Sequence, residues 1–488
     1  MREKDITKIN VIMSLLQQVV VTVCGFILPR IILTSFGSDV NGLVSSLNQF
    51  LSYVSLLEGG ITGVVCASLY RPLVEKSQER LSAVINAANS FYKKISAIFV
   101  VYTIAIAVIY PLFIRKDFSF EFITSLTLIL GINLFVQYCF SITWKTLLIA
   151  DKKVYIVSAA YIIVVIANTI LTVVIVKLYP SIHVVKLGSA IVYFIQPIIY
   201  KNYVKKHYPI DKSVKKDSQM LSQRWDGFGI NIAAFIHNNT DVVILTLFSS
   251  LSEVSVYSVY FLVVMGLKSI VQAVSNGLSP SLGHTYATGN KDKLEGQFVK
   301  IESLLLFITF SLFTVGGFGI TPFVQIYTTG VNDANYYQPL FGWIIIFAEM
   351  IFCIREPYVV LAYCANRFKD FTRIAFIEAA LNIVISICFV YKFGIIGVAI
   401  GTAASMLFRT VCQIGYLRNH ILHRSILNLV RRIGVNAIGM IVACTLINRF
   451  LGKCELNILS WIIYCIKASG ICAVVFSIAY MANRHVNA

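Results

Sequence analysis

Apolar runs of about twenty residues recur along this chain from one end to the other, and a helical run of that length spans the hydrocarbon core of a bilayer. A spanning segment must satisfy its own backbone hydrogen bonds, as an α-helix does. We count fourteen runs, at residues 11–33, 41–67, 94–114, 122–149, 154–176, 183–203, 226–248, 254–280, 301–320, 338–362, 371–391, 394–417, 427–449 and 457–482. The sequence therefore predicts an all-α polytopic membrane protein with about 14 transmembrane helices.

The low share of charged residues excludes the other fold classes. Only 13% of residues are charged and 57% are hydrophobic, whereas soluble domains carry about 25% charged residues. A transmembrane β-barrel would need short alternating segments, which the sequence lacks. The eleven cysteines form no CxxC pair and no spacing typical of metal ligands, so we expect buried apolar thiols, no metal site and no cofactor.

A short phrase occurs twice and indicates an internal repeat. Residues 32–36 read ILTSF and residues 244–248 read ILTLF. At the same offset Ser38 matches Ser250, and Val44 matches Val256. Weak internal symmetry in a membrane protein is typical of transporters, with the binding site between the halves. The longest polar connection, residues 201–224, lies where a linker between two halves would be expected.

Basic residues are distributed unevenly among the predicted loops. They number 28 on the side of the N-terminus, with Arg432 among them, and 7 on the opposite side, with Lys186 among them; the other 6 of the 41 lie within spans. Lys and Arg concentrate in cytoplasmic loops, so both termini are predicted to be cytoplasmic. Contact with an anionic leaflet explains the net charge of +18 and leaves no need for a nucleic-acid partner.

Charged residues within the predicted spans are the candidate functional residues. Each basic one costs about 2.5–3.5 kcal/mol at a helix centre, so each needs a partner, water or an interface. Lys145 and Arg409 are expected to extend to the cytoplasmic interface. For Arg30, Lys268 and Arg355 two interpretations stay open: internal ion pairs, or a cationic lumen between two bundles. Arg30 lies toward the outer end of its span, so extension to that interface is a further alternative for it. Guanidinium groups match phosphate oxygens, so the lumen interpretation predicts an anionic headgroup as ligand.

Acidic residues in spans are the candidates for ion coupling. His237 and Asp241 are four residues apart and share a helix face, as expected for a proton or cation carrier. The alternative is a local hydrogen bond beside Asn238 and Asn239. The other acidic candidates are Glu58, Glu349 and Glu356.

Proline and glycine mark candidate bends and close contacts. Pro29, Gly59 and Gly60 are candidate hinges, because alternating access requires helices that bend. Gly397 and Gly401 form a GxxxG pattern, which predicts close helix packing.

Several segments together resemble the polysaccharide-transporter flippases. This family includes the O-antigen and capsule repeat-unit flippases of the multidrug/oligosaccharidyl-lipid/polysaccharide exporter superfamily. The similar segments lie in order along nearly the whole chain, at residues 36–43, 49–51, 56–61, 69–73, 147–155, 240–245, 256–260, 378–382 and 394–402.

The resemblance implies two pseudo-symmetric six-helix bundles plus two C-terminal helices. The corresponding domains are 1–220, an N-terminal bundle with a cytoplasmic linker, 221–425, a C-terminal bundle, and 426–488, two additional helices. It implies translocation of undecaprenyl-pyrophosphate-linked oligosaccharide, for lipopolysaccharide O-antigen or a capsular polysaccharide, across the bacterial plasma membrane. Arg30, Lys268 and Arg355 would then receive the pyrophosphate. Membrane lipid and a coupling ion, proton or sodium, are the other expected partners.

Two other functions stay open at this point. A cation-coupled multidrug exporter of the same superfamily would use Asp241 for coupling. A membrane-bound polysaccharide polymerase or ligase would need a large outer loop, but the longest outer connection covers only about residues 321–337. The sequence also contains no phosphate loop, HExxH or nucleophile elbow, so we expect a protein that is not an enzyme.

Overall fold

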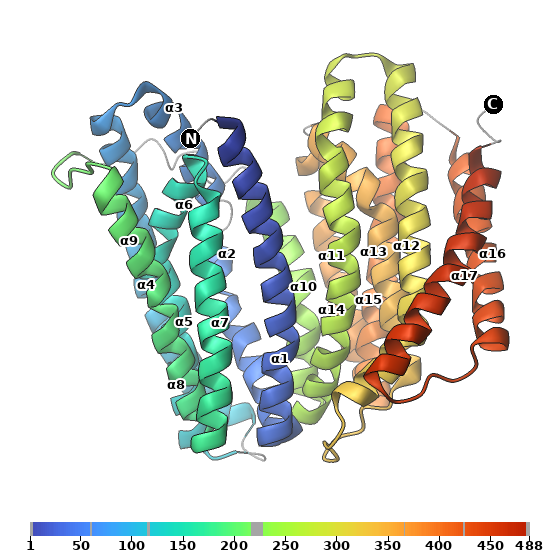
Figure 1. Ribbon diagram of the computed structural model, residues 1–488, viewed down its shortest axis with the longest axis horizontal. Helices are drawn as coiled ribbons and strands as arrows, with labels where there is room; N and C mark the ends of the chain where they lie inside the picture. The colour runs from blue at the N-terminus through green and yellow to red at the C-terminus, as the bar shows by residue number, and fades with distance from the viewer. Residues whose placement is uncertain are drawn as a thin grey trace. The chain divides into compact units, whose positions relative to one another are not determined.

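The computed structural model describes residues 3–58, 61–114, 118–215, 228–365, 367–422 and 425–484, and this part of the chain is built from helices (Figure 1). Within it, 11 helices are long and apolar enough to cross a membrane. One of them, Lys8–Ser52, has 45 residues; it contains the first predicted span and the beginning of the second, which continues into the helices Ser55–Glu58 and Ile61–Glu75. Of the other predicted spans, one corresponds to the helix Phe228–Phe248, in which Asn239–Phe248 is the described apolar stretch, and one to the helix that carries Glu349, Arg355 and Glu356. The prediction of a multi-pass all-α membrane protein with about 14 spans is confirmed.

The chain divides into two compact units, residues 1–232 and 233–488. The division falls inside a helix. The domain boundary predicted at residues 220 and 221 lies outside the described residues and stays a prediction, as do the other predicted domain limits.

The first unit is a bundle in which helices distant in sequence pack in pairs. α1 packs on α7, α4 on α5, and α8 on both α5 and α7. α3 packs on α4 and α6. The helices are α1 (Glu3–Ser52), α2 (Ser55–Glu58), α3 (Ile61–Glu75), α4 (Gln78–Phe113), α5 (Phe120–Val136), a π-helical turn (Gln137–Ser141), α6 (Ile142–Ala150), α7 (Val154–Leu178), α8 (Ile182–Tyr193) and α9 (Ile195–His207).

The second unit adds two helices to a similar bundle. Its helices are α10 (Phe228–Phe248), α11 (Leu251–Ala287), α12 (Lys291–Tyr327), α13 (Pro339–Cys364), α14 (Thr372–Phe393), α15 (Ile395–Leu417), α16 (Ile426–Phe450) and α17 (Ile458–Arg484). α13 lies at the centre and packs on α11, α12 and α15. The added helices α16 and α17 pack on each other and on α12 (Figure 1).

The same pairings recur in the two units and give the repeat a structural meaning. The contacts α3–α4, α3–α6, α4–α5, α5–α8 and α7–α8 in the first unit correspond to α11–α12, α11–α13, α12–α13, α13–α15 and α14–α15 in the second. Helices that correspond in the two units follow the same order along the chain, as the internal repeat predicts. This supports two pseudo-symmetric bundles followed by two C-terminal helices.

In both units the repeated phrase marks the end of the first membrane helix. In α1, the residue after Phe36 is Gly37, which has φ 85° and ψ 174° and interrupts the helix. Glycine adopts this left-handed region without the penalty of a Cβ atom. In the second unit α10 ends at Phe248, and the Ser250 hydroxyl caps α11 by accepting from the Glu253 backbone N–H. The helix continues through Pro29, while Gly59 and Gly60 lie outside the described residues.

Two helices begin well before their apolar segments. α4 begins at Gln78 and α12 at Lys291, whereas the sequence predicted spans from residues 94 and 301. The difference arises because hydropathy detects only the apolar part of a helix, whereas the helical backbone continues into the polar residues before it. At α12, the Asn290 side chain accepts from the Lys293 backbone N–H at 2.9 Å.

The predicted close packing of Gly397 and Gly401 is present in the α14–α15 pair. A Cβ atom on Gly397 would lie 2.5 Å from the carbonyl oxygen of Phe389 on α14. The chain turns between the two helices at Gly394, which has φ 54°. Both helices are therefore separate spans joined by one glycine.

Candidate transport site

A cluster of buried charged side chains lies inside the second unit. Its members, which we call the charge cluster, share almost complete burial in a membrane-spanning bundle. They are Lys268 on α11, Glu349, Arg355 and Glu356 on α13, Glu378 on α14 and Arg409 on α15. Buried charges in membrane helices typically pair with one another and mark functional regions.

Lys268 forms an ion pair with Glu349. Lys268 Nζ lies 2.9 Å from Glu349 Oε2 and 3.7 Å from the centre of the Phe352 ring. The same ring lies 4.9 Å from Arg355 Cζ. Residues three and four apart share a helix face, so the α13 sequence places this acid, this ring and this base in one row.

Glu378 forms ion pairs with two arginines. Its Oε1 lies 3.6 Å from Arg355 Nη1, and its Oε2 forms a direct ion pair with Arg409. The Arg409 side chain is only 11% exposed, so the prediction that it extends to the interface is wrong. The reason is Glu378, one helix away, which offers a buried partner that sequence spacing alone does not show.

For Lys268 and Arg355 the contacts agree with the alternative of internal ion pairing. Each has a carboxylate partner within the unit. Their predicted role as substrate-binding cations stays a prediction.

Asp241 forms a separate polar centre where four helices of the second unit converge. Its Oδ2 accepts hydrogen bonds from the Tyr257 hydroxyl at 2.8 Å and from Thr402 Oγ1 at 2.7 Å. Asn382 Nδ2 in turn donates to Thr402 Oγ1 at 3.0 Å. Asp241 is buried, and among the described residues its Oδ1 has no hydrogen-bond partner. The side chain of His237, its predicted companion, lies outside the described residues.

The described acids of this region outnumber its bases by one. The charge cluster contains three basic and three acidic side chains, and the nearby Asp241 is a fourth acid. With every group ionised, the sum of +3 and −4 is −1 in a buried region, and a buried charge without a partner is costly. A bound proton or cation would remove this excess. Two of the four acids, Glu356 and Asp241, form no ion pair with a described base, and Asp241 is the one held by two hydroxyl donors.

The other candidates lie in the first unit. Arg30 on α1 and Lys145 on α6 are exposed. Glu58, at the end of α2, accepts a hydrogen bond from the Thr62 hydroxyl, and that hydroxyl lies 2.9 Å from the Tyr92 hydroxyl. Glu58 therefore belongs to a polar group of its own. Its predicted role in ion coupling is not tested by these contacts.

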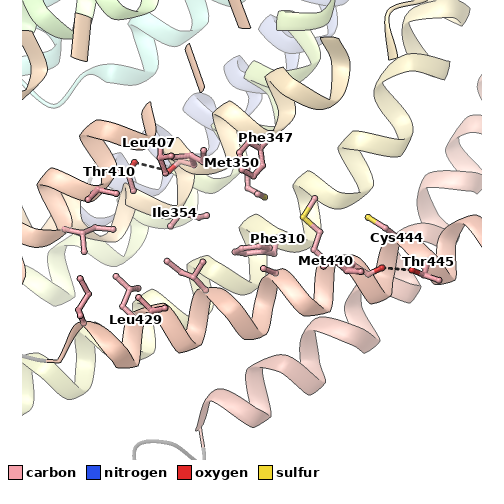
Figure 2. A pocket seen from close by; sticks show the side chains of 18 of the residues that line it. Phe310, Phe347, Met350, Ile354, Leu407, Thr410, Leu429, Met440, Cys444 and Thr445 are labelled. Carbon is pink, nitrogen blue, oxygen red and sulfur yellow. Dashed lines mark hydrogen bonds between the residues drawn. The ribbon is translucent and has the colours of Figure 1, made fainter. Parts of the chain in front are cut away.

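An apolar groove runs along α16 in the second unit. Its volume is about 1040 Å³, at the upper end of ordinary ligand sites, which measure about 300–1,000 Å³. Phe310 on α12, Phe347 and Met350 on α13, and Leu429 on α16 contribute to its walls (Figure 2). Several lining side chains are also largely exposed, including Val411 at 63% and Ile441 at 67%. The groove is therefore open at its side, and Asn448 and Arg449 lie at one end of α16.

One ion pair was missed by the sequence analysis. Arg432 was assigned to a cytoplasmic loop, but it lies inside α16, is buried, and donates from Nη1 to Glu302 Oε2 on α12 at 2.6 Å. The Tyr358 hydroxyl on α13 donates to the other oxygen of Glu302. Lys186, assigned to an outer loop, likewise lies inside α8. Both residues fall among the first six positions of a predicted span, 427–449 and 183–203, where a charged residue was counted with the adjoining loop.

Comparison with known proteins relates the fold to transporters. No protein-family model matches the chain, and no curated protein matches its sequence. Among solved structures, "Lipid II flippase MurJ, inward closed conformation" matches with a TM-score of 0.71 and 14% identity over 96% of this chain and 97% of that one.

Two multidrug transporters match over somewhat less of the chain. An inward-facing "multidrug resistance MATE family transporter of the MOP superfamily" has a TM-score of 0.63 and 14% identity, covering 82% of this chain and 94% of that one. The "MATE multidrug transporter DinF-BH" has a TM-score of 0.62 and 12% identity, covering 87% of this chain and 97% of that one. The chain therefore has the fold that MurJ shares with MATE transporters.

Proposed function

We propose that this protein is a flippase for undecaprenyl-pyrophosphate-linked oligosaccharide, the repeat unit of an O-antigen or capsular polysaccharide. It would act in the bacterial plasma membrane with both termini in the cytoplasm, and its two halves would give the substrate access to each side in turn. The proposal draws on the sequence resemblance and on a fold that a lipid II flippase also adopts.

The observation that carries the proposal is the apolar groove along α16. A lipid-linked substrate needs a place for a long hydrocarbon chain, whereas its sugar and pyrophosphate need a polar site. The groove walls are built almost entirely from apolar side chains, and their lateral exposure admits a chain from the bilayer. Burying hydrocarbon there costs no polar desolvation, and Arg449 at the end of α16 suits an anionic group.

The polar part of the substrate would be held by cations. Arg30 is one candidate, because it is exposed. Lys268 and Arg355 are the other two, and each also contacts a carboxylate within the second unit. Glu349, Glu356 and Glu58 stay candidates for ion coupling beside Asp241.

The decisive experiment blocks the groove without changing the rest of the helix. Ala437 lines the groove, and Ala437→Trp would fill it. Ile438, its neighbour on α16, is 64% exposed and does not line it, so Ile438→Trp is the matched control. The purified protein is reconstituted in proteoliposomes, and translocation of a fluorescent undecaprenyl-pyrophosphate oligosaccharide is measured.

We expect Ala437→Trp to reduce translocation about tenfold, because the indole ring would occupy the space that the hydrocarbon chain needs, and overfilling an apolar site is costly. Ile438→Trp should stay near the wild type. Equal translocation by both variants would overturn the groove's role. No translocation by the wild-type protein, in any ion gradient, would overturn the flippase proposal.

A cation-coupled multidrug exporter is the second candidate, and the observation in its favour is Asp241. A buried carboxylate held by two hydroxyls and free of a described base is suited to carry a coupling ion. Efflux of a cationic dye from the same proteoliposomes, driven by a proton or sodium gradient, separates the candidates. Efflux that Asp241→Asn abolishes and Ala437→Trp leaves unchanged would favour the exporter.

A further inference from the structure

The corner between α3 and α4 carries two arginines that one carboxylate holds together. α3 ends at Glu75 and α4 begins at Gln78. Glu75 Oε1 lies 2.7 Å from Arg71 Nε, and its Oε2 lies 2.8 Å from Arg80 Nη1. The Arg71 and Arg80 side chains are 80% and 63% exposed. A single acid therefore fixes two cations from two helices beside each other at the surface.

The two guanidinium groups keep donors for a further ligand. A guanidinium offers five N–H donors in a planar fork, and the described contacts with Glu75 use one nitrogen of each arginine. Both arginines line a pocket of about 440 Å³. Its other walls include the small side chains Ala67, Ser68 and Ala83, which leave room for a group as large as a phosphate.

The charge of this arrangement favours an anion. Hydrogen bonding from Arg71, followed by the Coulomb attraction of both arginines, lowers the pKa of Glu75, so the carboxylate stays ionised at neutral pH and keeps both guanidinium groups in position. Two positive charges and one negative charge leave a surplus of +1 at the pocket. Paired arginines are the side chains best suited to bind phosphate oxygens in two places.

Apolar side chains beside the pocket indicate what carries the anion. Tyr70 and Val74, on the same helix as Arg71, are 53% and 83% exposed. Exposed tyrosine and aliphatic residues beside arginine at the end of a membrane helix are typical of the interface between headgroups and acyl chains. The distribution of basic loops predicts that this end faces the cytoplasm, where the leaflet is anionic.

We propose that the α3–α4 corner is a binding site for the phosphate headgroup of an anionic phospholipid. Arg71 and Arg80 bind the phosphodiester, Glu75 positions them, and Tyr70 and Val74 contact the adjoining acyl region. This inference does not depend on what the protein transports.

The test measures lipid retention by the full-length protein. The protein is purified in detergent and titrated with phosphatidylglycerol or with phosphatidylcholine of the same acyl chains, and bound lipid is counted by native mass spectrometry. The wild type should retain phosphatidylglycerol preferentially. Arg71→Ala with Arg80→Ala should weaken retention about 30-fold, the product of two contributions of the size that basic side chains make at an anionic membrane.

The matched control removes the same charge elsewhere on α4. Lys93 and Lys94 are exposed and do not line the pocket, so Lys93→Ala with Lys94→Ala should change retention less than twofold, as expected for charges that the ligand does not contact. An equal loss in both double variants would show general charge attraction and overturn the site. Displacement of phosphatidylglycerol by inorganic phosphate at the same concentration would also overturn it, because the ligand would then be a free anion.

A second double variant controls for the possibility that the alanine variant loses lipid only because it misfolds. Arg71→Lys with Arg80→Lys keeps the charge but loses the planar fork, so it should lose most of the preference for phosphatidylglycerol while it elutes and unfolds like the wild type. Full retention by this variant would overturn the proposed recognition by guanidinium groups.

Discussion

Arg432 on α16 donates a hydrogen bond from Nη1 to Glu302 Oε2 on α12 across 2.6 Å, and both side chains are at most 2% exposed. The pair joins residues that are 130 positions apart in the sequence. It attaches one of the two added C-terminal helices to the core of the second unit, and α16 is the helix that lines the apolar groove. The ion pair therefore holds one wall of the groove in place.

Removing one partner of this pair should destabilise the protein strongly. Glu302→Gln leaves the Arg432 guanidinium buried opposite a neutral amide, and breaking a buried ion pair costs about 3–5 kcal/mol. We expect a clear fall in the thermal unfolding temperature of the detergent-purified protein. The matched control is Arg431→Ala, because Arg431 is the exposed neighbour on the same helix.

The double variant separates charge from packing. Glu302→Gln combined with Arg432→Met removes the uncompensated charge, and replacing both partners of a buried pair is often close to neutral. Its unfolding temperature should recover most of the loss. A double variant as unstable as Glu302→Gln alone would contradict the ion-pair account.

Gly397→Ala should disrupt the α14–α15 pair. The new Cβ atom would lie 2.5 Å from the backbone carbonyl of Phe389, and a backbone atom has no rotamer by which to move away. Overpacking of this kind costs about 1–3 kcal/mol. Gly415→Ala on the same helix is the control, because no atom outside the neighbouring helical backbone lies within 4 Å of its Cβ position and alanine favours a helix by about 0.5–1 kcal/mol. Equal unfolding temperatures for the two variants would refute the predicted clash.

The start of the linker should detach when Asn86 is truncated. Asn86 Nδ2 on α4 donates to the carbonyl oxygens of Asp211 at 2.9 Å and Val214 at 3.1 Å, and Ser82 Oγ accepts from the Asp211 backbone N–H at 3.0 Å. Asn86→Ala removes two of these bonds, so trypsin should cut at Lys212 and Lys215 several times faster, because proteolysis follows the open population. Gln78→Ala, an exposed residue on α4, should leave the rate unchanged.

The same linker contacts should be insensitive to pH in the physiological range. The Ser213 backbone N–H, followed by its hydroxyl, lowers the pKa of Asp211. A lowered folded pKa contributes stability above the unfolded value of about 3.9 and loses it as pH falls through the folded value. The proteolysis rate of the linker, measured with a pH-tolerant protease, should therefore stay constant from about pH 5 to 8 and rise only below about pH 4. A rise near pH 6 would contradict this assignment.

The spans and the repeat could be predicted from sequence because both depend on local patterns. An apolar run of the right length forms a membrane helix almost irrespective of what lies around it, and the recurring phrase marks the end of the first helix in both units. Gly37, which provides that end in α1, was missed in favour of Pro29. A proline within a helix is conspicuous in sequence, whereas the backbone angle of a glycine is not.

The partners of the charged residues could not be predicted, since each pair joins helices far apart in sequence. Arg355 lies near Glu349 and Glu356 in sequence, yet its carboxylate partner is Glu378 on α14. Arg432 lies near the start of its predicted span, where a basic residue is typical of a loop or interface, and its partner Glu302 lies on α12, 130 positions away. The polar ligands around Asp241 were missed for a different reason: Tyr257 and Thr402 carry no charge and are common in apolar helices.

Asp241 should be needed for energy coupling but not for folding. In Asp241→Asn the amide oxygen can still accept from Tyr257 and Thr402, so we expect the unfolding temperature to stay close to that of the wild type. The substitution removes the excess negative charge, however, and with it the electrostatic reason for the centre to bind a proton or cation. Transport driven by an ion gradient should stop, while exchange of substrate without a gradient should continue.

A graded pair of substitutions at Thr402 tests the same centre without removing the acid. Thr402→Ser keeps the hydroxyl that donates to Asp241, whereas Thr402→Val loses it and leaves a buried carboxylate with one donor fewer, a loss of about 1.5–3 kcal/mol for a hydrogen bond to a charged group. Gradient-driven transport should survive in Thr402→Ser and shift its ion dependence in Thr402→Val. If Asp241→Asn transports against a gradient as the wild type does, the coupling ion is bound elsewhere, and the acids of the first unit, beginning with Glu58, become the next to test.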